Sequence, residues 1–262
     1  MEPSQLNWIA NFIWGIADDV LRDLYVRGKY RDVILPMTVL RRLDAVLEPT
    51  KPSLLDMKAS LDKAKITNQD QALRQAAGQA FYNTSRFTLR DLKARASQQQ
   101  LKADFEAYLD GFSPNVQDIL ENFEFRNQIP RLSKADALGT LIEKFLSPDI
   151  NLSPNAVLDG DGSVKQPGLD NHGMGTVFEE LVRRFNEENN EEAGEHWTPR
   201  ASGSTASAGP SWSATFPNWA SRCPQRRWAA SGRWWRTITG RSSTWRNWRA
   251  RWALPSRPPA AI

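Results

Sequence analysis

The sequence predicts an all-α fold over residues 1–147, and three observations lead to that prediction. Apolar residues recur at three- and four-residue spacing along several segments, as they do on one face of an α-helix. No comparable run alternates polar and apolar residues, so strands should be absent or minor. Short polar sequences of the kind that begin helices also precede the apolar segments. These patterns together indicate a multi-helix N-terminal domain.

The first two expected helices are separated by the turn-like sequence RGKY at 27–30. Pro36 is expected to kink or to start the second helix, because proline lacks the backbone N–H that a helix interior uses. The sequence EPTKPS then ends this helix. The first apolar face comprises Leu6, Ile9, Ile13, Ile16, Val20 and Leu24, and the second comprises Val33, Ile34, Met37, Leu40, Leu43, Val46 and Leu47.

Three later sites are predicted to begin helices. TLRD at 88–91 and SKAD at 133–136 place a hydroxyl and a carboxylate three residues apart, the spacing of a capping box. Ser113 followed by Pro114 is a third start, since proline at the first helical position loses no hydrogen bond. Apolar faces follow at Val116, Ile119, Leu120 and Phe123, and at Leu138, Leu141, Ile142, Phe145 and Leu146.

The composition changes twice after the helical domain. Residues 148–173 concentrate Pro, Gly, Asn, Asp and Ser, so they are expected to form a linker loop. A final helix is expected at about Met174–Glu188, in a further unit at 174–200. Residues 201–262 form a tail with too few aliphatic residues to pattern a helix or a strand.

Candidate metal ligands receive little support from the sequence. Asp159-x-Asp161-x-Ser163 begins like a calcium loop, but Val164 stands where the loop needs glycine and Asp170 where it needs glutamate. A polar turn is therefore the preferred interpretation.

The remaining ionisable candidates also lack partners in the sequence. His172 and His196 lie 24 positions apart with no further ligand at zinc spacing, and Cys223 is interpreted as an inert thiol. Consecutive acids at a helix end usually face water, and this applies to Glu187, Glu188, Glu191, Glu192 and Glu195. No catalytic residue and no metal site is predicted.

The tail differs in charge from the rest of the chain. Residues 201–262 contain ten Arg, eight Trp and no Lys, Asp or Glu, so they carry +10. Because the whole chain carries +4, residues 1–200 carry −6. This composition is typical of GC-rich coding DNA read out of frame, and the tail is expected to be disordered. Nucleic-acid binding stays open as the alternative, since arginine pairs with phosphates and indole rings stack on bases.

Location can also be predicted from composition. The chain has one cysteine, no secretory signal and no apolar run of about 18 residues. We expect a cytoplasmic protein without a membrane span.

Two segments resemble a known family. GMGTVFEELVRRFNEENNEEAGEHWTPR at 173–200 and NFIWGIADDVLRDLYVRGKYRDVILPMTVLRRLD at 11–44 resemble the modification (M) subunit of type I restriction-modification systems. These subunits are adenine-specific DNA methyltransferases, and the resemblance covers residues 1–200. It implies that 174–200 contains the first helix of a truncated α/β methyltransferase domain. The implied partners are the specificity (S) subunit, the restriction (R) subunit, a second M subunit and DNA.

The resemblance also implies a cofactor, S-adenosyl-L-methionine. By position, the cofactor-contacting residues would be Glu195, His196, Trp197, Thr198, Pro199 and Arg200. The family continues with a glycine-rich turn for the cofactor and an Asn-Pro-Pro-Phe type motif for the flipped adenine, and neither follows Arg200. We therefore expect that this chain does not bind the cofactor and does not methylate DNA by itself, and that it retains the helical assembly domain.

Overall fold

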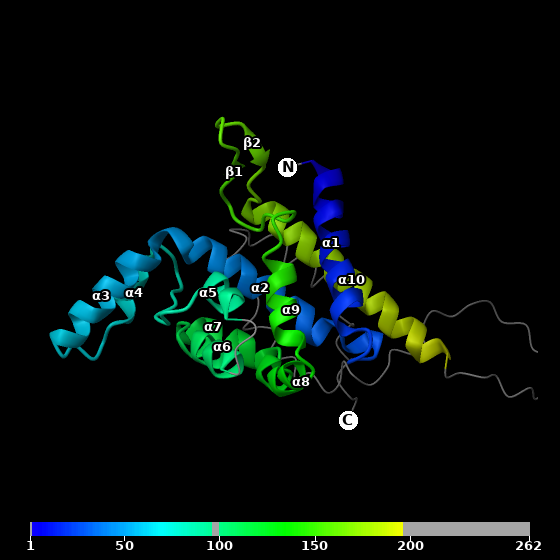
Figure 1. The fold of residues 1–262 in the computed structure, drawn as a ribbon, viewed down its shortest axis with the longest axis horizontal. Coiled ribbons are helices and arrows are strands. Elements are labelled where there is room, and N and C mark those ends of the chain that lie inside the picture. The colour runs from blue at the N-terminus through cyan, green and yellow to red at the C-terminus, as the bar shows by residue number, and fades with distance from the viewer. Residues whose placement is uncertain (1, 96–99, 196–262) are drawn as a thin grey trace, which may run out of the picture.

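The computed structural model describes the backbone of residues 2–95 and 100–195, and their side chains up to residue 188. Helices dominate this part of the chain, which confirms the all-α class (Figure 1). A two-stranded antiparallel hairpin is the sheet that the described residues contain. The first elements are α1 (Pro3–Leu21), the 3-10 helix η1 (Arg27–Lys29), α2 (Arg31–Leu47), η2 (Glu48–Thr50), α3 (Lys51–Lys63), α4 (Asp70–Ala77) and α5 (Leu89–Ala94). They are followed by α6 (Leu101–Asp110), α7 (Pro114–Asn122), η3 (Phe125–Asn127), α8 (Ile129–Lys134), α9 (Ala137–Phe145), β1 (Val157–Leu158), β2 (Val164–Gln166) and α10 (Asn171–Glu195).

Helix α2 is the centre of the core. Every residue from Val33 to Ala45 is buried, and a helix that is covered on all sides lies inside a domain. Its apolar residues belong to one hydrophobic cluster with those of α1, α6, α9 and α10. Pro36 lies inside this helix and does not start it.

Two of the three predicted helix starts are confirmed. The Thr88 hydroxyl accepts a hydrogen bond from the Asp91 N–H at 3.2 Å, and the Asp91 carboxylate accepts one from the Thr88 N–H at 2.8 Å. This pair is the capping box of α5. Helix α7 begins at Pro114 with Ser113 before it, although the Ser113 hydroxyl accepts a hydrogen bond from the Tyr82 N–H instead of capping its own helix.

The third predicted start, at Ser133, is wrong. Ser133 lies in the last turn of α8, and α9 begins at Ala137, four residues later. Between the two helices, Asp136 adopts a left-handed backbone conformation with φ 52°. Ile129 and Leu132 are fully buried, so tertiary packing stabilises the short helix α8. Six residues are too few to show a helical apolar pattern in the sequence.

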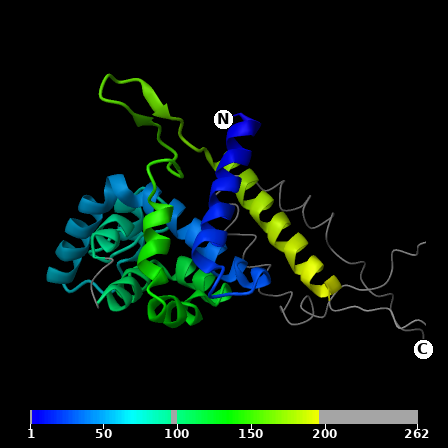
Figure 2. The ribbon, with the colours of Figure 1, turned by 45° about the vertical axis from the view of Figure 1, so that its right-hand side comes forward.

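The linker at 148–173 and the last helix, α10, follow the helical body in the chain. The strands β1 and β2 form a hairpin that projects from the body (Figure 2). Helix α10 was expected at about 174–188, but it begins earlier, at Asn171, and ends later, at Glu195. It packs against α1. Its residues Met174, Val177, Leu181 and Phe185 belong to the same core as α1 and α2. The assignment of 174–200 to a separate catalytic domain stays a prediction, and residues 201–262 lie outside the described part.

A helix that crosses a bilayer needs about 20 consecutive, mostly apolar residues. None of the described helices is both long enough and apolar enough to cross a membrane.

Candidate functional site

The predicted cofactor-contacting residues fall at the limit of the described chain. Glu195 is the last residue of α10, and its backbone is helical. His196, Trp197, Thr198, Pro199 and Arg200 lie outside the described residues, as does Cys223. Whether these six residues contact S-adenosylmethionine therefore stays a prediction.

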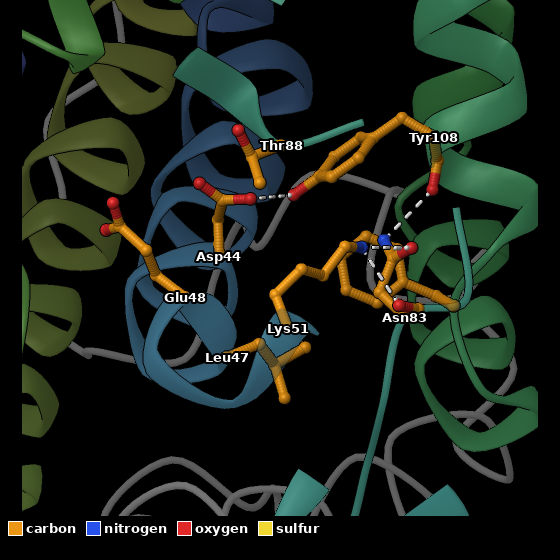
Figure 3. A pocket seen from close by; sticks show the side chains of 8 residues that line it. Asp44, Leu47, Glu48, Lys51, Asn83, Thr88 and Tyr108 are labelled. Carbon is orange, nitrogen blue, oxygen red and sulfur yellow. Dashed lines mark hydrogen bonds between the residues drawn. The ribbon is translucent and has the colours of Figure 1, made fainter. Parts of the chain in front are cut away.

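A buried polar cluster lies on one side of α2, formed by Asp44, Lys51, Asn83 and Tyr108 (Figure 3). The Tyr108 hydroxyl donates to the Asp44 carboxylate at 3.0 Å, and the Leu89 N–H donates to the same oxygen at 3.2 Å. The Lys51 ammonium donates to the Asn83 carbonyl at 2.9 Å and to its side-chain oxygen at 3.3 Å. The Asn83 amide in turn donates to the Tyr108 carbonyl at 3.1 Å. The cluster therefore joins α2, α3, α6 and the segment before α5.

Burial shifts the ionisation of this cluster. It raises the pKa of Asp44, partly offset by the hydrogen bond from Leu89 and the charge of Arg41. Burial together with the neighbouring Asp44 charge raises the pKa of Tyr108 well above its ordinary value. The pKa of Lys51 falls to about 8, because burial disfavours the ammonium more than Asp44 stabilises it.

The cluster has no room for a substrate. The cavity between these side chains measures about 10 Å³, which is close to the space of one water molecule. Its polar atoms are also hydrogen-bonded to one another rather than directed at a ligand. We conclude that the cluster has a structural role and holds these helices in a fixed arrangement.

A second buried group, Arg42, lies on the linker side of α2. One guanidinium nitrogen donates to the carbonyls of Leu152 at 2.7 Å and Leu169 at 2.6 Å, and the other donates to the Asn171 side chain at 2.9 Å. Burial lowers the pKa of Arg42 to about 10. Arg42 thus joins both ends of the linker and the start of α10 to the central helix.

One larger hollow lies on the surface, where the first turns of α1 meet the linker. This groove has a volume of about 270 Å³. Its lining consists of Ser4, Gln5, Trp8, Ile9, Asp149, Asn151, Gln166 and Pro167.

The other sequence candidates have ordinary structural roles. Asp159 to Ser163 form the turn of the β1–β2 hairpin, with the Gly162 N–H donating to the Asp159 carbonyl at 2.9 Å. This result supports the interpretation as a polar turn. His172 is exposed in the first turn of α10. No group of His, Cys, Asp and Glu suited to a metal ion occurs among the residues that the structure describes.

The acidic cluster of α10 is only partly described. The Glu187 carboxylate accepts hydrogen bonds from Arg183 at 2.5 and 2.7 Å and is more than half exposed, as expected for a solvated face. Glu188 is more buried and lies 3.8 Å from the Arg27 guanidinium of η1. The side chains of Glu191, Glu192 and Glu195 lie outside the described part.

Comparison with known proteins identifies the helical body. Neither a curated protein nor a solved structure matches the chain. The family model described as the HsdM N-terminal domain matches residues 9–145, which extend from the first turns of α1 to the end of α9. This range is more than half of the chain and contains both the buried polar cluster and Arg42. The chain therefore belongs to the HsdM N-terminal domain family, the N-terminal region of the modification subunit of type I restriction-modification systems.

Proposed function

We propose that residues 2–195 act as the assembly domain of a type I modification subunit and that this chain does not transfer methyl groups by itself. The observation that carries the proposal is the family match over 9–145, because this family assembles with other subunits of type I systems. The specificity subunit is the partner that we propose first. The restriction subunit, a second modification subunit and DNA would join through the complete assembly.

The described structure supports an assembly role in a second way. Its buried polar side chains, the cluster around Asp44 and the guanidinium of Arg42, hold helices and the linker together. Methyl transfer to adenine also requires an extruded base aligned with the donor. The glycine-rich turn and the Asn-Pro-Pro-Phe type motif that would supply this alignment do not occur after Arg200. On this proposal, methyl transfer depends on groups that lie outside this chain.

The assembly role is tested by co-expression. The full chain, carrying an affinity tag, would be produced with the specificity subunit from the same restriction-modification locus, and the pair would be analysed by size-exclusion chromatography. We expect one complex that contains both chains. Separate elution of the two chains at micromolar concentration would contradict the proposal.

The absence of catalysis is tested on the same preparation. Titration of the purified full chain with S-adenosylmethionine in a calorimeter should give no binding heat above dilution. Incubation with labelled cofactor and DNA should leave the DNA unlabelled. Stoichiometric cofactor uptake would overturn this part of the proposal and leave the assembly role intact.

A second candidate function follows from the composition of the tail. Ten arginines and eight tryptophans in 201–262 would suit non-specific binding to nucleic acid. Such binding would weaken steeply with salt and would be lost when residues 201–262 are deleted, whereas association with the specificity subunit would survive the deletion.

A further inference from the structure

Exposed apolar side chains occur at the groove between α1 and the linker and on the hairpin that the linker forms. Trp8 is 48% exposed at the groove itself, and Val157, Leu158 and Val164 of the hairpin are 42%, 58% and 61% exposed. The hairpin projects on the side of the body where α1 begins (Figures 1 and 2). Its residue Gln166 lines the groove together with Trp8. We call this surface, made of residues 2–12 and 148–170, the groove face. Exposed apolar area of this kind marks a surface that another chain segment can cover.

The groove face is acidic. Its charged residues are Glu2, Asp149, Asp159, Asp161, Asp170 and a single basic residue, Lys165. Lys165 already lies 3.9 Å from the Asp159 carboxylate within the hairpin. A surface with this balance repels phosphates, so nucleic acid does not suit it. It suits a polypeptide that carries both apolar and basic side chains.

One segment of the same chain has this chemistry. Residues 201–262 contain ten arginines, eight tryptophans and no acidic residue. We propose that residues 201–262 bind to the groove face of their own chain, with an indole ring in the groove beside Trp8 and an arginine next to Asp149 of the groove lining. An indole placed there would cover apolar area, and arginine would pair with Asp149 in a bidentate manner.

The length of the chain permits this contact. Helix α10 leads away from the linker for 25 residues, which corresponds to about 37 Å. The 28 residues from 196 to 223 can span about 90 Å when extended. Trp212, Trp219 and Trp228 can therefore return to the groove face. Because residues 201–262 and the groove face belong to one molecule, their high effective concentration also favours the contact.

This inference goes beyond the proposed assembly function and does not depend on it. Its consequence is competition: a partner that uses the groove face, or a nucleic acid that binds the arginines, must first displace the contact within the chain. An association with the specificity subunit elsewhere on the domain would be unaffected.

The natural sequence offers a direct test, because Cys223 is the single cysteine and lies between Trp219 and Trp228. The purified full chain would be labelled at Cys223 with a benzophenone maleimide and irradiated at low protein concentration. Cross-linked monomers would then be isolated and mapped by mass spectrometry. We expect most cross-links to fall on residues 2–12 and 148–170.

Two variants complete the test. Trp8→Glu changes the groove without touching the core, and Met57→Glu is the matched control on α3, where Met57 is 40% exposed. Cross-links to the groove face should fall about tenfold in Trp8→Glu, the loss expected when one large apolar contact is replaced by a charge. They should stay unchanged in Met57→Glu.

Three outcomes would overturn the proposal. The first is a cross-link pattern spread evenly over the helical body, and the second is equal yields in the two variants. The third is cross-linking only between separate chains, which would assign the groove face to a second copy. Circular dichroism of each variant verifies that the helical body remains folded.

Discussion

At the scale of single residues, the buried polar groups of α2 connect parts of the domain that are distant in sequence. Arg42 binds the carbonyls of Leu152 and Leu169, which lie more than a hundred positions further along the chain. Asp44 and Lys51 make the corresponding connections to Tyr108 and Asn83. Burying any of these groups without its hydrogen-bond partners would cost free energy. The arrangement of helices that supplies all the partners is therefore favoured over others.

Replacing Arg42 should therefore destabilise the domain strongly. Arg42→Met keeps the aliphatic part of the side chain but leaves two buried carbonyls and the Asn171 amide oxygen without a donor. We expect the free energy of unfolding in urea to fall by about 3 kcal/mol or more. Arg22→Met removes an arginine from an exposed ion pair with Asp18 and should change the stability very little. Equal stability of the two variants would contradict the role given to Arg42.

Lys51 should make the stability depend on pH. Burial lowers its pKa to about 8 in the folded chain, against an ordinary value of 10.5. Between these values the unfolded chain binds more protons than the folded chain, so the free energy of unfolding should rise as the pH rises from about 8 to 10.5. The rise is at most about 3 kcal/mol.

The measurement compares wild type with Lys51→Met by urea unfolding at pH 7 and pH 10. The difference in unfolding free energy, wild type minus variant, should increase with pH, because the variant lacks the titrating group. Lys58→Met is the control, since Lys58 pairs with Asp62 on the surface. A difference that stays constant between the two pH values would show that the Lys51 pKa is not lowered.

At the scale of elements, the sequence predicts helices well where the local signal is complete. The capping box at Thr88 and the Ser113-Pro114 start are both confirmed, because a cap and the first turn of a helix interact within four residues. SKAD shows the same spacing and does not cap α9, because Ser133 already belongs to α8. The local pattern cannot decide which of two adjacent helices a residue joins when buried side chains such as Ile129 and Leu132 hold the first helix in place.

The loop before α5 crosses the end of α6 closely enough to require a glycine. The Thr84 N–H donates to the Gly111 carbonyl at 2.8 Å, and the Ser113 N–H donates to the Tyr82 carbonyl at 3.0 Å. A Cβ atom at Gly111 would lie 2.4 Å from the Ser85 nitrogen and 2.5 Å from the Asn83 side-chain oxygen. The backbone itself would have to move to accommodate it.

Two glycine substitutions should thus have opposite effects. Gly111→Ala should lower the free energy of unfolding by about 1–3 kcal/mol, because it overpacks this crossing. Gly15→Ala in α1 meets no atom within 4 Å and should raise it by about 0.5–1 kcal/mol, because alanine favours a helix interior. Thermal unfolding monitored by circular dichroism measures both changes. A stable Gly111→Ala variant would show that the crossing is looser than the structure indicates.

At the scale of the whole molecule, α10 is packed as part of the helical body. Phe185 is 1% exposed, and its ring lies 4.9 Å from the ring of Trp14 in α1. Arg42 anchors the beginning of the same helix through Asn171. The matched family range ends at residue 145, so α10 lies beyond it in the chain. The buried residues of α10 nevertheless belong to the same hydrophobic core.

Truncation of Phe185 should accordingly weaken the whole body. Phe185→Ala should lower the free energy of unfolding by about 3–5 kcal/mol, with one cooperative transition in urea. Leu158→Ala in the exposed hairpin should change it by less than about 0.5 kcal/mol. If α10 unfolded separately, Phe185→Ala would instead produce an early loss of helix and leave the main transition in place.

The helical class, several helix starts and the family could be predicted without the structure, because apolar periodicity and caps act over a few residues and the resemblance lies in contiguous segments. The sequence also showed the opposite charges of residues 1–200 and 201–262. The charged residues Arg41, Arg42 and Asp44 lie among apolar residues of the second predicted helix, and this was a further signal in the sequence, since buried charges need partners.

The partners of these buried groups are known from the fold and not from the sequence. Arg42 meets Leu152 and Leu169, and Lys51 meets Asn83, through contacts that no local pattern encodes. The groove face likewise exists only because the chain brings Trp8 and the 148–170 linker together after more than 130 intervening residues. Hydrogen bonds and apolar contacts act over a few ångströms in space, whatever the separation of their residues along the sequence.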